Sequence, residues 1–140
     1  MYRALVRRLV RRAFGDLGEG RFQHNQSRFA PDAVMRVHSD GRTCTYRGKA
    51  ELQQAFRTLG ESSLEGPFEL LDIWVNGWPW DTRVAVAWKR INRRTSLPVY
   101  GMNRIRIGAQ GVLEEDVFIG DRISQEADVA NRSSAAATAS

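Results

Sequence analysis

The stretch Asp72-Ile-Trp-Val-Asn-Gly-Trp-Pro-Trp-Asp-Thr-Arg-Val-Ala-Val-Ala-Trp88 decides the fold of this chain. Its centre, Gly77 to Asp81, has the residues that a turn favours, because glycine leaves φ free, proline fixes it and aspartate can bond its own backbone. In the second arm, Val84, Val86 and Trp88 share one face of an extended strand, and the residues between them point to the other face. The pattern predicts a long β-hairpin.

The composition around this hairpin is that of one soluble globular domain. The 140 residues are 42% hydrophobic and 26% charged, enough for a core without disulfides or metal. Cys44 is the single cysteine, so we expect no internal disulfide and no cysteine-based metal cluster, which suits a reducing cytoplasm. No apolar run approaches the roughly 20 residues of a membrane span. We therefore predict a cytoplasmic protein with no membrane partner, metal or cofactor.

The net charge of +5 raises the question of a nucleic-acid partner. Nearly all of the positive charge is arginine, since Lys49 and Lys89 are the only lysines. No recognition-helix, RNA-binding or zinc-finger pattern accompanies the charge. We therefore predict that the chain does not bind nucleic acid.

The first predicted helix spans residues 3–17, where apolar residues recur at helical spacing opposite an arginine-rich face. Such a basic amphipathic start is also typical of a membrane-surface helix or a transit peptide. We favour the first helix of the domain, because Asp16 and Glu19 follow and no cleavage-like spacer separates this segment from the rest.

Two more helices and a set of strands complete the predicted elements. The second helix runs over residues 21–30 with Phe22 and Phe29 on one face, and ends before Pro31. The third begins near Lys49, with Gly60 as its C-cap. Besides the hairpin, the predicted strands are residues 32–37, 43–46, 100–107 and 112–119. Residues 61–67 are predicted to form a loop, and residues 93–96 the tip of a second connection between strands. Residues 123–140 have almost no apolar content and are predicted to be disordered.

Helices followed by long antiparallel strands make an α+β fold. Two segments, Phe29-Ala-Pro-Asp-Ala33 and Tyr46-Arg-Gly-Lys49, resemble the SnoaL-like branch of the nuclear-transport-factor-2-like superfamily. The hairpin from Gly77 to Val86, followed by Tyr100 and by Gly111 to Asp116, is similar to small bacterial members of that branch. The resemblance covers residues 3–121. It implies that residues 1–122 form a cone, in which a strongly bent, mostly antiparallel sheet wraps around three N-terminal helices.

The resemblance also implies a pocket at the wide end of the cone and a homodimer formed through the outer sheet face. The expected lining residues are Phe14, Leu17, Phe29, Phe56, Trp74, Trp88, Tyr100 and Phe118. The tryptophans of the hairpin region form either an aromatic cage for a flat ligand or ordinary core and dimer packing, and we favour packing. Arg104 and Arg106 form either an anion site or a solvent-facing ladder with Glu114, and we favour the ladder.

The superfamily includes polyketide cyclases, ketosteroid isomerases, epoxide hydrolases, dehydratases and binding modules, so its fold predicts a pocket and not a reaction. Epoxide hydrolases of the limonene type need an Arg-x-Asp pair where this chain has Val84-Ala-Val-Ala-Trp88, and a last-strand aspartate where it has Phe118. Ketosteroid isomerases need a tyrosine on the first helix, which here offers Phe14 and Leu17 inward. Neither chemistry fits.

His38 and Asp116 are the predicted acid–base residues. His38 ends a strand and occupies a position that points toward the cavity in many SnoaL-like relatives, and its ordinary pKa suits proton transfer near neutral pH. Asp116 resembles the acid that cyclases of this branch place on the last strand, where aromatic surroundings would raise its pKa. The alternative places both side chains in solvent.

The predicted function is therefore a SnoaL-like protein whose pocket holds a small hydrophobic or aromatic molecule. In its catalytic form it carries out cofactor-free cyclisation, isomerisation or dehydration. The alternative is a non-catalytic module that binds a ligand or a protein. The sequence leaves open which of the two applies, and it does not identify the ligand.

Overall fold

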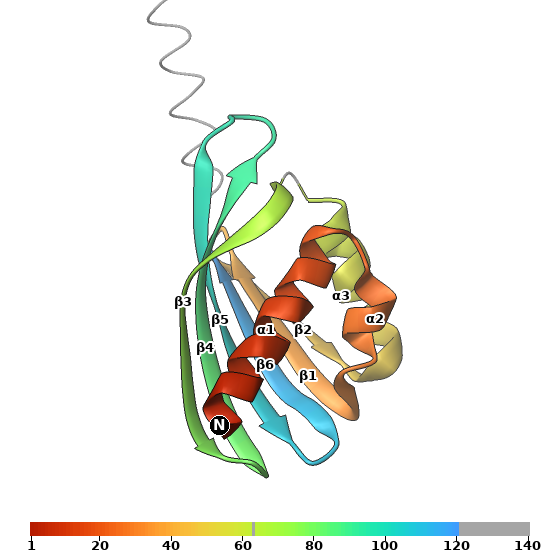
Figure 1. The fold of residues 1–140 in the computed structure, drawn as a ribbon. Helices are drawn as coiled ribbons and strands as arrows, with labels where there is room; N and C mark the ends of the chain where they lie inside the picture. Colours follow the sequence, from red (N-terminus) through yellow and green to blue (C-terminus); the bar gives the residue numbers. More distant parts are fainter. Residues whose placement is uncertain (63, 121–140) are drawn as a thin grey trace, which may run out of the picture.

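The computed structural model describes residues 1–62 and 64–120 (Figure 1). The segment predicted to be disordered, residues 123–140, lies outside the described residues. The described elements are α1 (Tyr2–Gly18), α2 (Phe22–Gln26), β1 (Phe29–Ser39), β2 (Arg42–Arg47), α3 (Gly48–Gly60), β3 (Leu64–Trp78), β4 (Asp81–Asn92), β5 (Pro98–Gly108) and β6 (Gly111–Ile119). No helix in this part of the chain is long and apolar enough to cross a membrane.

One mixed sheet of six strands, in the order β2-β1-β6-β5-β4-β3, forms the body of the molecule. Neighbouring strands are antiparallel except β1 and β6, which run parallel. The sheet curves around the helices, which all lie on one side of it (Figure 1). The predicted cone-like α+β architecture is therefore confirmed.

The predicted hairpin is the longest strand pair of the described structure, with β3 and β4 paired from Leu64 and Asn92 to Trp78 and Asp81. Gly77 has a positive φ of 93°, which favours glycine, and a Cβ placed there would lie 2.2 Å from the carbonyl oxygen of Asp81. The register shifts between Leu70 and Asp72, an irregularity that strengthens local twist. The turn residues and the irregular register together shape the bent edge of the sheet.

Side chains of each strand alternate between an inner face, covered by the helices, and an outer face on the opposite side of the sheet. Val84, Val86 and Trp88 point inward and are buried, as the alternation predicted. They pack with Val6, Val10 and Phe14 of α1 in one core cluster. A second cluster joins α3 to the inner faces of β1 and β6 and contains Met35, Leu52, Phe56 and Val117.

The second helix is shorter than predicted, because α2 ends at Gln26 and Phe29 already belongs to β1. The Ser27 hydroxyl donates to the carbonyl of His24 at 2.6 Å, a local bond that competes with helix continuation. The N–H of Val112 on β6 donates a hydrogen bond to the carbonyl of Arg28 at 2.9 Å, and Phe29 pairs with Val112. Pairing with β6 therefore outweighs the short helical pattern.

Two other boundaries also differ from prediction. The segment expected as a loop, 61–67, contains the start of β3, because Leu64 and Glu65 pair with β4 before the register shifts around Gly66 and Pro67. Gly60 is the last residue of α3 and not its cap. A Cβ at Gly60 would lie 2.8 Å from the ring of Phe22, so this glycine makes room for the contact between α2 and α3.

Candidate functional site

A small cavity of about 40 Å³ lies between the inner face of the sheet and the helices. Its wall is mostly apolar, and the polar side chains on it are few. The lining residues come from all three helices and from five strands: Leu17, Phe22, Met35, Phe56, Leu59, Ser62, Leu64, Phe68, Trp88, Arg90, Asn103, Glu115, Val117 and Ile119. An apolar hollow with a few converging polar groups has the composition of a small-molecule site, and at this volume it admits a molecule of only a few atoms.

Glu115 is the carboxylate on this wall. It lies on the inner face of β6, between the outward-facing Glu114 and Asp116, and the residue is only 7% exposed. The amide nitrogen of Asn103 donates to Oε1 of Glu115 at 2.8 Å, and the indole N–H of Trp88 donates to Oδ1 of Asn103 at 2.8 Å. A chain of hydrogen bonds therefore runs from Trp88 through Asn103 to the carboxyl group and fixes its position.

Burial raises the pKa of Glu115 to about 7, because the charged form loses its hydration. The hydrogen bond from Asn103 lowers this pKa, and the nearby charge of Asp116 raises it further. A carboxyl group with this pKa is present both with and without its proton near neutral pH. It can therefore remove a proton from a ligand and return it, as general acid–base catalysis requires.

A contact with Phe68, which Arg90 covers in turn, holds the Trp88 end of this hydrogen-bond chain. The ring of Phe68 meets Trp88 edge-to-face with centroids 5.1 Å apart, and the guanidinium carbon of Arg90 lies 4.3 Å above the centroid of Phe68. Gly101 lies directly under the indole, where an added Cβ would come within 2.2 Å of the ring. The site therefore depends on a residue without a side chain on β5.

The predicted acid–base pair, His38 and Asp116, is brought together on the other face of the sheet. Nε2 of His38 lies 3.0 Å from Oδ1 of Asp116, and Nδ1 lies 2.9 Å from the hydroxyl of Thr43. The imidazole stacks on Phe118 with centroids 4.4 Å apart. Arg104 donates to Asp116 at 3.1 Å. The two residues thus form part of a polar network on the outer face.

This placement corrects the expectation that His38 lies on the wall of the helix-side cavity. In β1 the buried Met35 points inward, so Arg36 and His38, which alternate with it, point outward. The expected rise in the pKa of Asp116 is also corrected. Burial favours a higher pKa, but the hydrogen bonds from His38 and Arg104 and the charge of Arg36 outweigh it, so the pKa lies below its usual value. A catalytic role for either residue stays a prediction.

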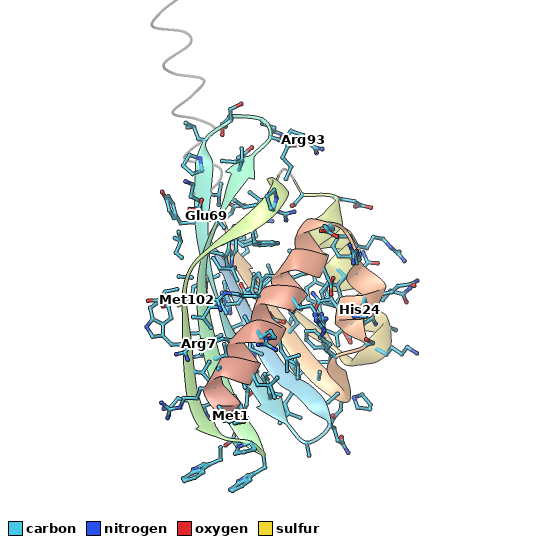
Figure 2. All side chains as sticks on the ribbon, viewed as in Figure 1. Met1, Arg7, His24, Glu69, Arg93 and Met102 are labelled. Atoms are coloured by element: carbon cyan, nitrogen blue, oxygen red, sulfur yellow. The ribbon has the colours of Figure 1, made fainter. Side chains whose placement is uncertain are left out.

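The predicted lining residues divide into three groups. Leu17, Phe56 and Trp88 line the cavity. Phe14 and Phe29 pack behind it, Phe14 against Phe68 and Phe29 against Phe56. The remaining three, Trp74, Tyr100 and Phe118, lie exposed on the outer face. Figure 2 shows Met102, a neighbour of this last group, on the side of the sheet away from the helices.

The two open questions about aromatic and basic residues have structural answers. The four tryptophans do not form a cage, because Trp88 is buried on the inner face while Trp78 and Trp80 stack on each other at the exposed tip of the hairpin, 5.8 Å apart. The two arginines are ion-paired, as the ladder interpretation expected, but with other partners. Arg104 pairs with Asp116 and Arg106 with Asp81, while Glu114 pairs with Arg36.

The polar residues of the cavity that sequence reasoning missed are Ser62, Arg90, Asn103 and Glu115. A signal for Glu115 was present, because it alternates in step with the buried Val117 while Glu114 and Asp116 do not. Asn103 and Arg90 carry no comparable signal, since only the folded sheet brings Asn103 to Glu115 and Arg90 to the cavity wall. Within residues 1–62 and 64–120, no group of three or more histidine, cysteine, aspartate or glutamate side chains could hold a metal ion.

No family model matches this chain, and no curated protein matches it. Solved structures with the same fold are numerous. A candidate polyketide cyclase from Sinorhizobium meliloti matches with a TM-score of 0.58 at 20% identity, over 74% of this chain and 87% of that chain. A nuclear-transport-factor-2-like protein of unknown function from Burkholderia xenovorans matches with a TM-score of 0.60 at 18% identity, over 84% of each chain.

A third solved structure, a protein of unknown function with a cystatin-like fold from Methylobium petroleophilum, matches with a TM-score of 0.64 at 15% identity. That match covers 84% of this chain and 77% of the other. Likeness at these identities establishes the fold. The chain has the nuclear-transport-factor-2-like fold, a scaffold that supports many different functions.

Proposed function

We propose that this protein uses its inner cavity for cofactor-free acid–base chemistry on a small, mostly apolar compound, with Glu115 as the proton carrier. The observation that carries the proposal is a buried carboxyl group whose pKa is about 7 in a cavity with mainly apolar walls. The fold shared with a candidate polyketide cyclase supports the same kind of chemistry. A cytoplasmic location accords with the lone cysteine.

The reaction follows from the position of Glu115. The ionised carboxylate takes a proton from a carbon next to a carbonyl group, and the resulting acid returns that proton to another atom of the same molecule. Such a transfer serves isomerisation, cyclisation or dehydration. A cavity of about 40 Å³ has room for roughly three water molecules. The proposed substrate therefore has only a few carbon atoms, and a larger one requires movement of side chains on the wall.

The competing proposal is a binding module that holds the same type of compound without reacting with it. The mostly apolar wall favours this alternative, because a ligand can be held there by burial alone. The two proposals differ only in whether Glu115 transfers a proton.

The exchange of deuterium into a small ketone distinguishes the catalytic proposal from the binding module. Butanone is incubated with the protein in D2O near pD 7, and ¹H NMR follows the loss of its α-protons. We expect exchange above the buffer rate, and we expect Glu115→Gln to reduce the enzymatic part by roughly 10²–10⁴-fold. The matched control is Glu114→Gln, which removes an outward-facing carboxylate from the same strand. Butanone binding without any exchange would favour the binding module.

We also propose that the protein forms a homodimer through the outer face of its sheet. Large apolar side chains gather there with high exposure: Leu71 49%, Trp74 48%, Tyr100 56%, Met102 42% and Phe118 40%. Exposed apolar patches of this kind are typical of protein contacts. In such a dimer the network of His38 and Asp116 would lie within the contact, where it would position the two subunits.

A further inference from the structure

We infer that the cavity takes a small apolar carboxylate, whose anionic group binds Arg90 while its apolar body lies against the hydrophobic wall. The inference rests on the proposed function and adds a substrate class to it. It stands on the position and partners of Arg90, the second ionisable side chain on the cavity wall.

Arg90 is a cation on the inner face of the sheet. It lies two residues after Trp88 on β4 and therefore points to the same side as the indole. Its Nε donates to the carbonyl of Gly66 at 2.9 Å, and its guanidinium carbon lies 4.3 Å from the centroid of the Phe68 ring, within the range of a cation–π contact. These contacts fix the plane of the guanidinium group at the cavity.

The charge of Arg90 is incompletely balanced. Burial lowers its pKa, and the charge of Glu65 raises it, but an arginine remains protonated at neutral pH. Among the described residues no carboxylate lies within ion-pair distance of Arg90, whereas Arg28, Arg36, Arg104 and Arg106 each have such a partner. A carboxylate from a ligand would supply the missing counter-ion, since the planar guanidinium group binds carboxylates through two parallel hydrogen bonds.

Apart from Glu115, Asn103 and Ser62, the rest of the wall is apolar. From the helices it presents Leu17, Phe22, Phe56 and Leu59, and from the sheet Met35, Val117 and Ile119. A cation together with a protonated Glu115 gives this cavity a net positive charge. A short carboxylate of only a few carbon atoms therefore complements the cavity in charge, polarity and size.

The test compares propanoate with propanamide, two small molecules of nearly equal size that differ in charge. Binding is followed by ¹H–¹⁵N NMR through the indole N–H of Trp88, which is assigned with Trp88→Phe. At pH 6 we expect the carboxylate to bind about tenfold more tightly than the amide, as a charged hydrogen bond allows. Arg90→Gln should abolish this preference. Lys89→Gln, which removes a charge from the outer face of the same strand, should preserve it.

Each outcome decides the inference. Equal binding of both compounds, or tighter binding of the amide, overturns the carboxylate assignment and leaves the proposed function intact. A preference that survives in Arg90→Gln overturns the role of Arg90. Binding of neither compound overturns the carboxylate inference, and the butanone exchange experiment then decides the proposed function separately. The ¹H–¹⁵N spectrum reports whether each variant is folded, and Arg90→Lys, which retains the charge, is expected to keep part of the preference even if Arg90→Gln does not fold.

Discussion

Three consecutive acidic residues of β6 lie in three different environments. Glu114 points outward and forms an ion pair with Arg36 at 3.2 Å. Asp116 also points outward, and its pKa falls below the usual value because His38, Arg104 and Arg36 outweigh the effect of its burial. Glu115 points inward, and its pKa rises to about 7. Alternation along one strand thus gives neighbouring carboxyl groups opposite titration behaviour.

The raised pKa of Glu115 has a cost in stability that depends on pH. Below pH 4.5 the group is neutral in both the folded and unfolded chain, so it costs nothing. As pH rises from 4.5 to 7, the unfolded chain ionises first and stability falls. Above pH 7 the folded state carries the full cost, about 3 kcal/mol for the difference between 4.5 and about 7.

Glu115→Gln removes this cost and preserves an oxygen that can accept from Asn103. We expect the variant to be more stable than the parent protein by up to about 3 kcal/mol at pH 8, and by less than about 1 kcal/mol at pH 5. Urea denaturation at the two pH values measures both differences. Glu114→Gln is the control and should show no such gain at pH 8. An equal effect of Glu115→Gln at both pH values would contradict the buried-carboxyl assignment.

At the scale of the strand, the contact between β4 and β5 depends on the space above Gly101. The indole of Trp88 occupies that space, and a Cβ at Gly101 would lie 2.2 Å from it. Trp88 is only 2% exposed and packs among core residues, and the cavity beside it measures only about 40 Å³. The small residue on β5 therefore positions the start of the hydrogen-bond chain to Glu115.

Gly101→Ala tests this packing. We expect a loss of about 3 kcal/mol in unfolding free energy, because overpacking a tight core forces side chains and backbone to shift. Gly15→Ala in α1 is the matched control, since an added Cβ there meets nothing within 4 Å and a helix favours alanine over glycine by about 1 kcal/mol. Thermal unfolding measures both. A Gly101→Ala variant as stable as the parent would show that the indole can move.

The elements show which parts of the fold could be predicted. The hairpin was predictable because alternation, turn residues and glycine all agree over 17 residues. The end of the second helix was not, because the pairing of Phe29 with Val112 is a contact between distant segments. Alternation in β1 was recognised, but the strand alone does not show which of its faces points toward the helices. The burial of Met35 decides that question and places His38 outside.

At the scale of the whole molecule, the outer face of the sheet is the proposed dimer contact. Its apolar residues lie on four neighbouring strands, with Met102 on β5 beside Phe118 on β6 and Ala87 on β4. Five of its large side chains are each at least 40% exposed. Pairing of two such faces would remove this apolar surface from water.

Light scattering tests the proposed dimer. We expect the parent protein to have twice the monomer mass at micromolar concentration, and Met102→Glu to be a monomer because it places a charge at the centre of the contact. Leu5→Glu, at an exposed position on α1, is the control and should remain dimeric. A parent protein that stays monomeric at high micromolar concentration would contradict the dimer.

The central claim is that Glu115 is the proton carrier of the inner cavity, and its own titration tests that claim most directly. The side-chain carboxyl carbons of the glutamates are labelled with ¹³C, and their chemical shifts are followed by NMR from pH 3 to 9. Glu115→Gln identifies the Glu115 signal. The structure predicts a midpoint of about 7 for Glu115, well above the ordinary value of 4.5. A midpoint near 4.5 would contradict the claim.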